Sequence, residues 1–185
     1  MSLLLVPLIV AVLPHGIAYP KATVTMNQNW STKMRRATKV KYKVFAYLTH
    51  RHRLLVFSHP FVPEAGIQVP AGTIKSNERP EEAVLREAFE ETGLSDLIID
   101  SFLGEQERDM SDFGRDEIHH RYFYHLRCIG NPPATWRHEE RDSSDEPKQV
   151  PIIFEFFWAV LPEGVPPLIA DHGKMLPQLL QRLSF

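Results

Sequence analysis

The chain of 185 residues has a single cysteine, Cys128, so no disulfide can form within it. A lone cysteine fits a reducing compartment, and within a strand it is most simply a small buried hydrophobe. The formal net charge is only −2. A protein that binds nucleic acid usually carries a broad basic surface. The composition therefore excludes a disulfide scaffold, and we expect no nucleic-acid partner.

The sequence also has no hydrophobic run long enough to cross a membrane. Residues 3–13 are apolar, but Pro7 interrupts them, and a spanning helix needs about 20 apolar residues. The basic start of a secretory signal is missing as well, since the first basic residue is Lys21. We therefore expect a cytoplasmic protein with no membrane partner. Small residues that resemble a cleavage site leave export through residues 1–20 open.

The remaining pattern predicts one domain, residues 38–185, after an N-terminal extension, residues 1–37, which is apolar first and then a polar linker. Alternating or continuous apolar residues predict strands, and two stretches have helical periodicity. The residues between 131 and 150 are polar and predict a long loop. The expected strands are 40–48, 54–57, 97–103, 118–128 and 152–161, and the expected helices are 80–92 and 175–183.

The predicted helix between Pro80 and Gly93 has two unlike faces. Proline is tolerated in a first helical turn, and glycine commonly follows a last turn. With about 100° per residue, the acids fall on one side of the helix and the apolar residues on the other. We therefore expect Phe89 to face the sheet, so that its replacement by alanine would cost about 3–5 kcal/mol. The acidic side holds Glu87, Glu90 and Glu91, and the apolar side holds Val84, Leu85, Ala88 and Phe89.

The acidic side is destabilising on its own. Like charges three and four residues apart repel, and anions in a last turn oppose the helix dipole. One interpretation is a solvated charged face. The other is a divalent cation that offsets both penalties, because Mg²⁺ prefers carboxylate oxygens and keeps water for a phosphate ligand.

The stretch from Gly72 to Leu94 resembles the Nudix box, Gly-x5-Glu-x7-Arg-Glu-(apolar)-x-Glu-Glu-x-Gly-(apolar). Every fixed position of the motif is met, and Ala88 and Leu94 fill the apolar positions. The resemblance implies an α/β fold, an α/β/α sandwich with a mixed β-sheet between helices. The fixed positions are Gly72, Glu78, Arg86, Glu87, Glu90, Glu91 and Gly93.

The resemblance also implies roles for these residues. Glu90 and Glu91 would be ligands of Mg²⁺, or of Mn²⁺, and Glu87 either a third ligand or the general base. The backbone carbonyl of Ala71, next to Gly72, would join the metal site. Arg86 would orient the glutamates with Glu78 as its partner. A purely structural ion pair between Arg86 and Glu78 is an equal alternative.

Some family members recruit a further carboxylate from outside the box. Glu139 and Glu140 are the first choice because Trp136 and His138 lie beside them in the predicted loop. A solvated loop charge is the alternative for each. Glu117 and Glu146 are further candidates, and His119 and His120 are expected in a cleft or at the surface rather than on a metal.

By resemblance, the activity is Mg-dependent hydrolysis of the pyrophosphate bond in a nucleoside diphosphate linked to another moiety. The partner would be this small molecule, and a homodimer remains open. Asp109 to Asp112 occupy the window where family subgroups carry substrate markers, and match none of them. The alternatives are a non-catalytic Nudix-like nucleotide sensor, which would often lack box glutamates, and an RNA-processing pyrophosphatase of the decapping type.

Overall fold

A computed structural model describes residues 38–140 and 151–183. The predicted extension, residues 1–37, and Glu146 lie outside the described residues. No helix within the described ranges is long and apolar enough to cross a membrane. The elements are β1 (Lys39–His50), β2 (Arg53–Ser58), β3 (Ala71–Thr73), α1 (Pro80–Thr92), β4 (Leu97–Asp109), β5 (Glu117–Cys128), β6 (Thr135–Glu140), β7 (Ile152–Val160) and α2 (Leu176–Leu183).

The strands form one seven-stranded sheet in the order β4-β5-β1-β2-β7-β6, with β3 also paired to β1. The long strand β1 is shared between two neighbours on the same side. Its residues 43–45 pair with β3, and its last residues pair with β2. On its other side β1 runs parallel to β5, whereas the other pairs are antiparallel. The sheet is therefore mixed, as predicted.

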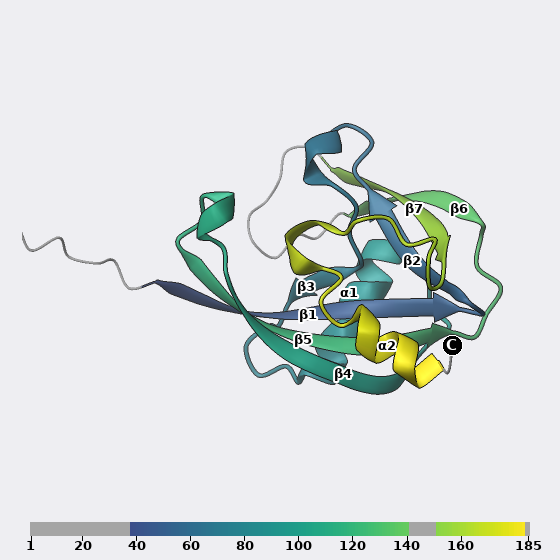
Figure 1. Cartoon of the computed structure of the whole chain (residues 1–185), viewed down its shortest axis with the longest axis horizontal. Coiled ribbons are helices and arrows are strands. Elements are labelled where there is room, and N and C mark those ends of the chain that lie inside the picture. Colours follow the sequence, from purple (N-terminus) through teal and green to yellow (C-terminus); the bar gives the residue numbers. More distant parts are fainter. Residues whose placement is uncertain (1–37, 141–150, 184–185) are drawn as a thin grey trace, which may run out of the picture. The chain divides into compact units, whose positions relative to one another are not determined.

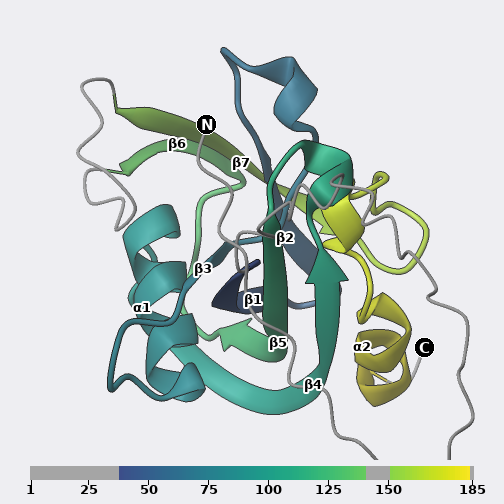
Figure 2. The same cartoon turned by 90° about the vertical axis from the view of Figure 1, so that its left-hand side faces the viewer.

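The sheet separates two hydrophobic cores, each closed by a helix. Val44 and Ala46 of β1 face the core that contains Val84 and Ala88 of α1. The alternate residues, such as Tyr47, face the core that contains Leu179 of α2. Figure 2 shows α1 and α2 on opposite sides of the strands, and Figure 1 shows α2 in front of β1 with α1 behind it. This is the predicted α/β/α sandwich.

Helix α1 begins and ends where its sequence predicts. Pro80 occupies the first turn, and the backbone N–H of Arg79 donates to the Glu82 carboxylate at 3.1 Å. At the other end Gly93 takes the left-handed conformation with φ of 73°, and its N–H donates to the carbonyl of Phe89 at 2.8 Å. Both ends therefore satisfy backbone groups that a helix leaves unpaired.

The prediction that Phe89 faces the sheet is wrong. Its side chain is 53% exposed, whereas Glu87 and Glu91 are each only 6% exposed. The angular relation between acids and apolar residues holds, but the buried sector of α1 is centred between them. Glutamates that build a site against β3 occupy part of the buried face, which turns Phe89 toward solvent.

The prediction of a loop through residues 131–150 is also wrong in part. Residues 135–140 form β6, which pairs with β7 at the edge of the sheet. The Trp136 ring stacks on Phe156 of β7 with centroids 5.0 Å apart. Polar residues in β6 concealed the strand because only one of its faces is covered. Residues 141–150 lie outside the described residues.

Candidate active site on helix α1 and strand β3

Strand β3 uses alternate residues to pair with β1 and to contact α1. The carbonyl of Pro70 and the N–H of Ile74 form hydrogen bonds with β1. Residues at odd positions therefore direct their backbone groups to the other side of the strand. There the N–H of Ala71 donates to Glu91 Oε2 at 3.0 Å, and the carbonyl of Thr73 accepts from Arg86 Nη2 at 3.0 Å. By the same alternation, the carbonyl of Ala71 faces the α1 side.

Gly72 is required because the Glu87 carboxylate lies against its backbone. A Cβ atom at position 72 would be 1.8 Å from Glu87 Cδ. Burial raises the pKa of the Glu87 carboxyl, and the neighbouring Arg86 opposes that rise. A buried carboxylate with a raised pKa is suited to accept a proton or to be neutralised by a cation.

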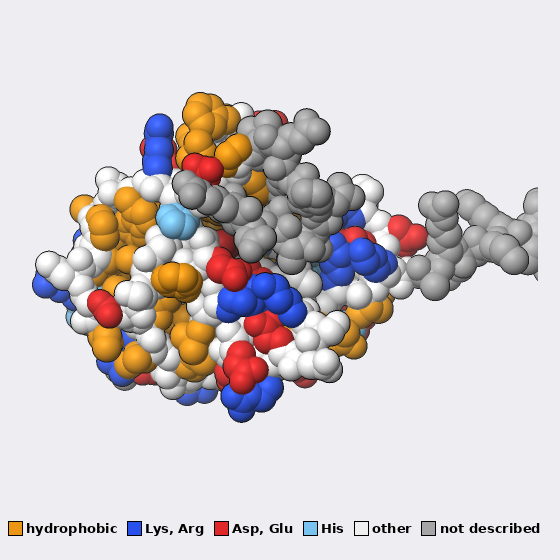
Figure 3. Space-filling view, turned by 180° about the vertical axis from the view of Figure 1, so that it is seen from behind, with side chains coloured by type: hydrophobic (Ala, Val, Ile, Leu, Met, Phe, Trp, Pro, Cys, Tyr) orange, Lys and Arg blue, Asp and Glu red, His pale blue; other side chains and the backbone are white. Residues whose placement is uncertain are grey.

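Arg86 connects the box glutamates. Its Nε and Nη2 donate to the two carboxylate oxygens of Glu78 at 2.6 and 2.8 Å. Its Nη1 lies 2.8 Å from Glu87 and 2.9 Å from Glu90. The paired guanidinium lowers the pKa of Glu78 to about 2. Arg86 therefore contacts three carboxylates. Figure 3 shows acidic and basic side chains gathered on the face that α1 covers.

The donors of this edge fit a hard divalent cation in their chemistry. Glu87, Glu90 and Glu91 offer carboxylate oxygens, and Ala71 offers a carbonyl oxygen on the same side of β3. Within residues 38–140 and 151–183, however, no three acidic, histidine or cysteine side chains are grouped as metal ligands. In this structure, Arg86 and the Ala71 N–H contact the carboxylate oxygens that would coordinate a bound cation.

Strand β6 contacts the carboxyl end of α1. Trp136 Nε1 donates to the carbonyl of Thr92 at 2.9 Å, and His138 Nε2 lies 3.0 Å from the carbonyl of Glu90. Because a carbonyl only accepts, this His138 nitrogen carries the proton. Both side chains satisfy carbonyls that end a helix. The sequence analysis placed Trp136 and His138 in a loop beside Glu139 and Glu140 and did not predict their contacts with α1.

The candidates for a metal ligand from outside the box differ in their positions. Glu117 is bound by Lys41 at 3.3 Å and by His119 at 3.2 Å. Glu139 follows His138 in β6, and side chains alternate along a strand, so Glu139 points away from α1. The side chain of Glu140 lies outside the described residues. The structure therefore brings the box residues together and adds neither Glu117 nor Glu139 to them.

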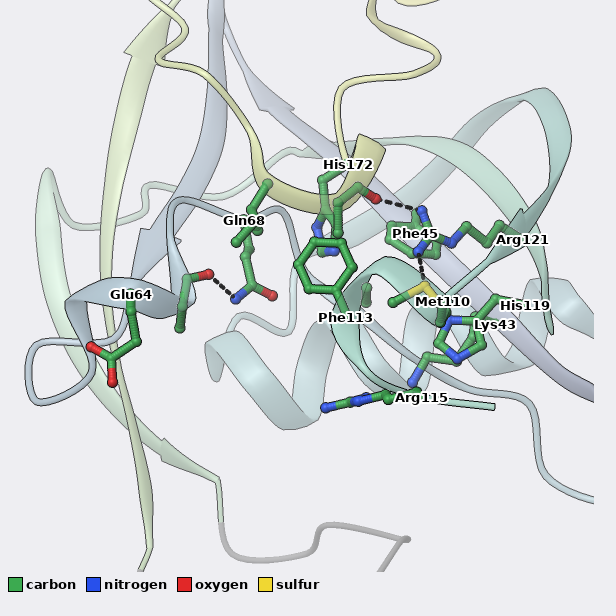
Figure 4. Close-up of a pocket in the computed structure, with 14 residues that line it drawn as sticks. Lys43, Phe45, Glu64, Gln68, Met110, Phe113, Arg115, His119, Arg121 and His172 are labelled. Carbon is green, nitrogen blue, oxygen red and sulfur yellow. Dashed lines mark hydrogen bonds between the residues drawn. The ribbon is translucent and has the colours of Figure 1, made fainter. Parts of the chain in front are cut away.

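A cavity of about 350 Å³ opens on the α2 side of the sheet and reaches Ala71. Figure 4 shows the side chains of Lys43, Phe45, Arg121 and His172 around it. The sequence analysis missed this cationic lining, although alternation along 118–128 places Arg121 opposite its tyrosines. The expectation of a cleft position holds for His119, which lines the cavity. The charged lining residues are Lys43, Arg115, Arg121 and Glu64.

The comparisons with known proteins agree with this geometry. A NUDIX domain model matches residues 40–179. A MutT NUDIX hydrolase from Burkholderia pseudomallei is 20% identical with a TM-score of 0.54, over 76% of this chain and 98% of that one. The NUDIX domain of Shewanella oneidensis NrtR, complexed with ADP ribose, is 20% identical with a TM-score of 0.51, over 84% and 94%. A UDP-X diphosphatase is 15% identical with a TM-score of 0.52, over 83% and 67%.

A search of the curated proteins gave no match. The solved structures share the fold, and the family model spans the domain from β1 into α2, including the acidic helix. The chain therefore belongs to the Nudix family.

Proposed function

We propose that this enzyme cleaves, with Mg²⁺, the pyrophosphate bond of a nucleoside diphosphate linked to another moiety. The observation that supports this proposal is the position of Ala71. Its backbone N–H contacts Glu91 of the acidic helix, and the same residue lines the cationic cavity. A substrate whose diphosphate lies at this boundary has its charged bond at the acids and the rest of the molecule in the cavity.

We assign each residue of the site a role. Glu90, Glu91 and the Ala71 carbonyl would hold the cation, which would supply neutralisation of phosphate charge and activation of water. Glu87, buried against Gly72 with a raised pKa, is either a further ligand or the base that takes the proton from water. Arg86 positions these carboxylates, and Glu78 fixes Arg86 through its paired hydrogen bonds. Mn²⁺ suits the same oxygen donors.

The substrate class rests on the cavity and on what similar proteins bind. Lys43, Arg115 and Arg121 give the cavity an excess of positive charge over its one carboxylate, Glu64, which favours a phosphate-bearing ligand. The similar structures include a domain complexed with ADP ribose and a UDP-X diphosphatase. We propose a ligand of that general kind, and a cytoplasmic location consistent with the single cysteine.

A nucleotide sensor without catalysis is the second candidate, because one similar NUDIX domain has bound ADP ribose. The complete set of box glutamates favours an enzyme. The two candidates separate in one experiment, in which the purified chain is incubated with a panel of nucleoside diphosphate derivatives, with Mg²⁺ or with EDTA, and the products are quantified. Mg²⁺-dependent release of a nucleoside monophosphate supports the enzyme. Saturable binding without product supports the sensor.

A further inference from the structure

Arg121 of β5 is a buried cation at the wall of the cavity. The residue is 2% exposed, and its Cζ lies 5.0 Å from the centre of the Phe45 ring. One terminal nitrogen donates to the carbonyl of Ala170 at 2.6 Å and the other contacts the sulfur of Met110 at 3.2 Å (Figure 4). Its Nε has no hydrogen-bond partner among the described residues.

The nearby carboxylates are bound to a different arginine. Asp171 Oδ2 lies 2.9 Å from Arg108 Nε, and Asp112 pairs with Arg108 Nη2. Within residues 38–140 and 151–183, no carboxylate pairs with Arg121. A buried charge without a partner costs several kcal/mol, and burial lowers the pKa of Arg121 to about 10. Arg121 still carries its charge near neutral pH.

A second cation lies beside Arg121 on the same face of the sheet. Lys43 of β1 is its cross-strand partner in the parallel register, and both residues line the cavity. Like charges opposite each other destabilise a sheet. Lys43 Nζ also donates to Thr73 Oγ1 of β3 at 3.0 Å. Lys43 therefore lies between the box strand β3 and Arg121.

We propose that Arg121, with Lys43 beside it, binds an anionic group that the substrate carries beyond its scissile diphosphate. The inference rests on the proposed function for the position of the diphosphate. Strands β3 and β5 flank β1, so they are two strand spacings apart, or about 10 Å. A phosphate held at the α1 edge would therefore lie about this far from the backbone of Arg121, so that Arg121 would contact another part of the ligand. Its fork of donors suits a phosphate monoester or a carboxylate.

The first test uses the full chain in EDTA, with inorganic phosphate as the probe and chloride at equal ionic strength as the reference. We expect phosphate to raise the melting temperature of the unmodified chain, and Arg121→Met to abolish the rise. Arg127→Met is the matched control, since Arg127 is an exposed arginine of the same strand paired with Asp100. It should keep the full rise, and so should Glu90→Gln, which affects turnover only.

The folding of the variant separates a ligand-binding role from a structural one. Replacing an unpaired buried charge by an apolar side chain is often neutral or stabilising, so the melting temperature of Arg121→Met without phosphate should equal or exceed that of the unmodified chain. If Arg121→Met does not fold, the structural role is shown and the proposal fails. Arg121→Lys, which keeps the charge without the fork, should show a smaller phosphate response. A response equal to that of the unmodified chain contradicts the proposal.

The second test compares two substrates with Mg²⁺, one whose distal sugar is neutral and one whose sugar bears a phosphate monoester. Arg121→Met should raise KM for the anionic substrate by about tenfold or more, because a charge-assisted hydrogen bond is lost, and should raise KM for the neutral substrate by a much smaller factor. Equal effects on both substrates, or no phosphate response of the unmodified chain, would overturn the proposal. If the unmodified chain shows the phosphate response but turns over none of the substrates, the proposed hydrolysis is overturned instead.

Discussion

The carboxylate of Glu87 lies where a side chain on Gly72 would begin, with Cδ 1.8 Å from the position of a Cβ atom. This contact joins the first fixed residue of the box, on β3, to the acidic helix α1. It also explains why the motif opens on glycine without invoking backbone flexibility. The glycine makes room for a carboxylate that is 6% exposed.

Gly72→Ala should therefore damage both folding and activity. The added methyl group displaces Glu87 or separates β3 from α1, and such overpacking typically costs about 1–3 kcal/mol. We expect this loss in urea unfolding, together with a fall in turnover. Gly173→Ala is the control, since its Cβ would lie 3.3 Å from the nearest atom, the flexible end of Leu176. Equal, small effects of both variants would contradict the account of Gly72.

Phe89→Ala should change the free energy of unfolding by no more than about 0.5 kcal/mol, as for ordinary surface substitutions. The reason is the 53% exposure of Phe89. Phe123→Ala is the matched control, because Phe123 is fully buried and stacks on Phe45 with centroids 4.7 Å apart. It should cost about 3–5 kcal/mol. A cost above about 2 kcal/mol for Phe89→Ala would restore the orientation first expected from the sequence.

Phe89 shows what the sequence could and could not predict. The spacing of residues 83–92 determines their relative angles on a helix, and the box identifies the residues that meet at β3. Periodicity assigns burial by polarity, however, and here Glu87 and Glu91 are buried because they build the site. Arg121 was missed for the same reason. An interpretation that assigns charged residues to the surface does not predict an arginine that is only 2% exposed.

The Glu78–Arg86 pair predicts a specific pH dependence of stability. The pKa of Glu78 is lowered from 4.5 to about 2, chiefly by its hydrogen bonds to Arg86. Between these values the unfolded chain binds more protons at this site, so stability rises with pH. The contribution is complete above about pH 4.5 and is lost as the pH falls toward 2.

Glu78→Gln should remove this part of the pH dependence and lower the free energy of unfolding near neutral pH by about 1.5–3 kcal/mol, the usual worth of hydrogen bonds between charged groups. Urea unfolding of both chains at several pH values between 2 and 7 measures the difference. A constant difference at every pH would show that the pair contributes no charge-dependent stability.

The N-terminal extension provides a prediction that the described residues do not test. Deletion of residues 1–33, so that Met34 initiates, should leave melting temperature and turnover nearly unchanged, because the family model begins at residue 40. Calorimetry and the product assay on the two chains check this. A large fall in melting temperature would show that the extension contributes to the core.

We propose that the carboxylates of α1 form a Mg²⁺-dependent hydrolytic centre at the edge of β3. Glu90 is the sharpest probe, because its side chain is 28% exposed and contacts Arg86 and Lys75 rather than the core. Glu82→Gln is the control, since Glu82 is an exposed acid in the first turn of the same helix. The decisive measurement is Mg²⁺-dependent turnover of the best substrate in the panel by the unmodified chain and both variants. We predict that Glu90→Gln lowers turnover by orders of magnitude with an unchanged melting temperature, while Glu82→Gln keeps it, and full turnover by Glu90→Gln would contradict the account.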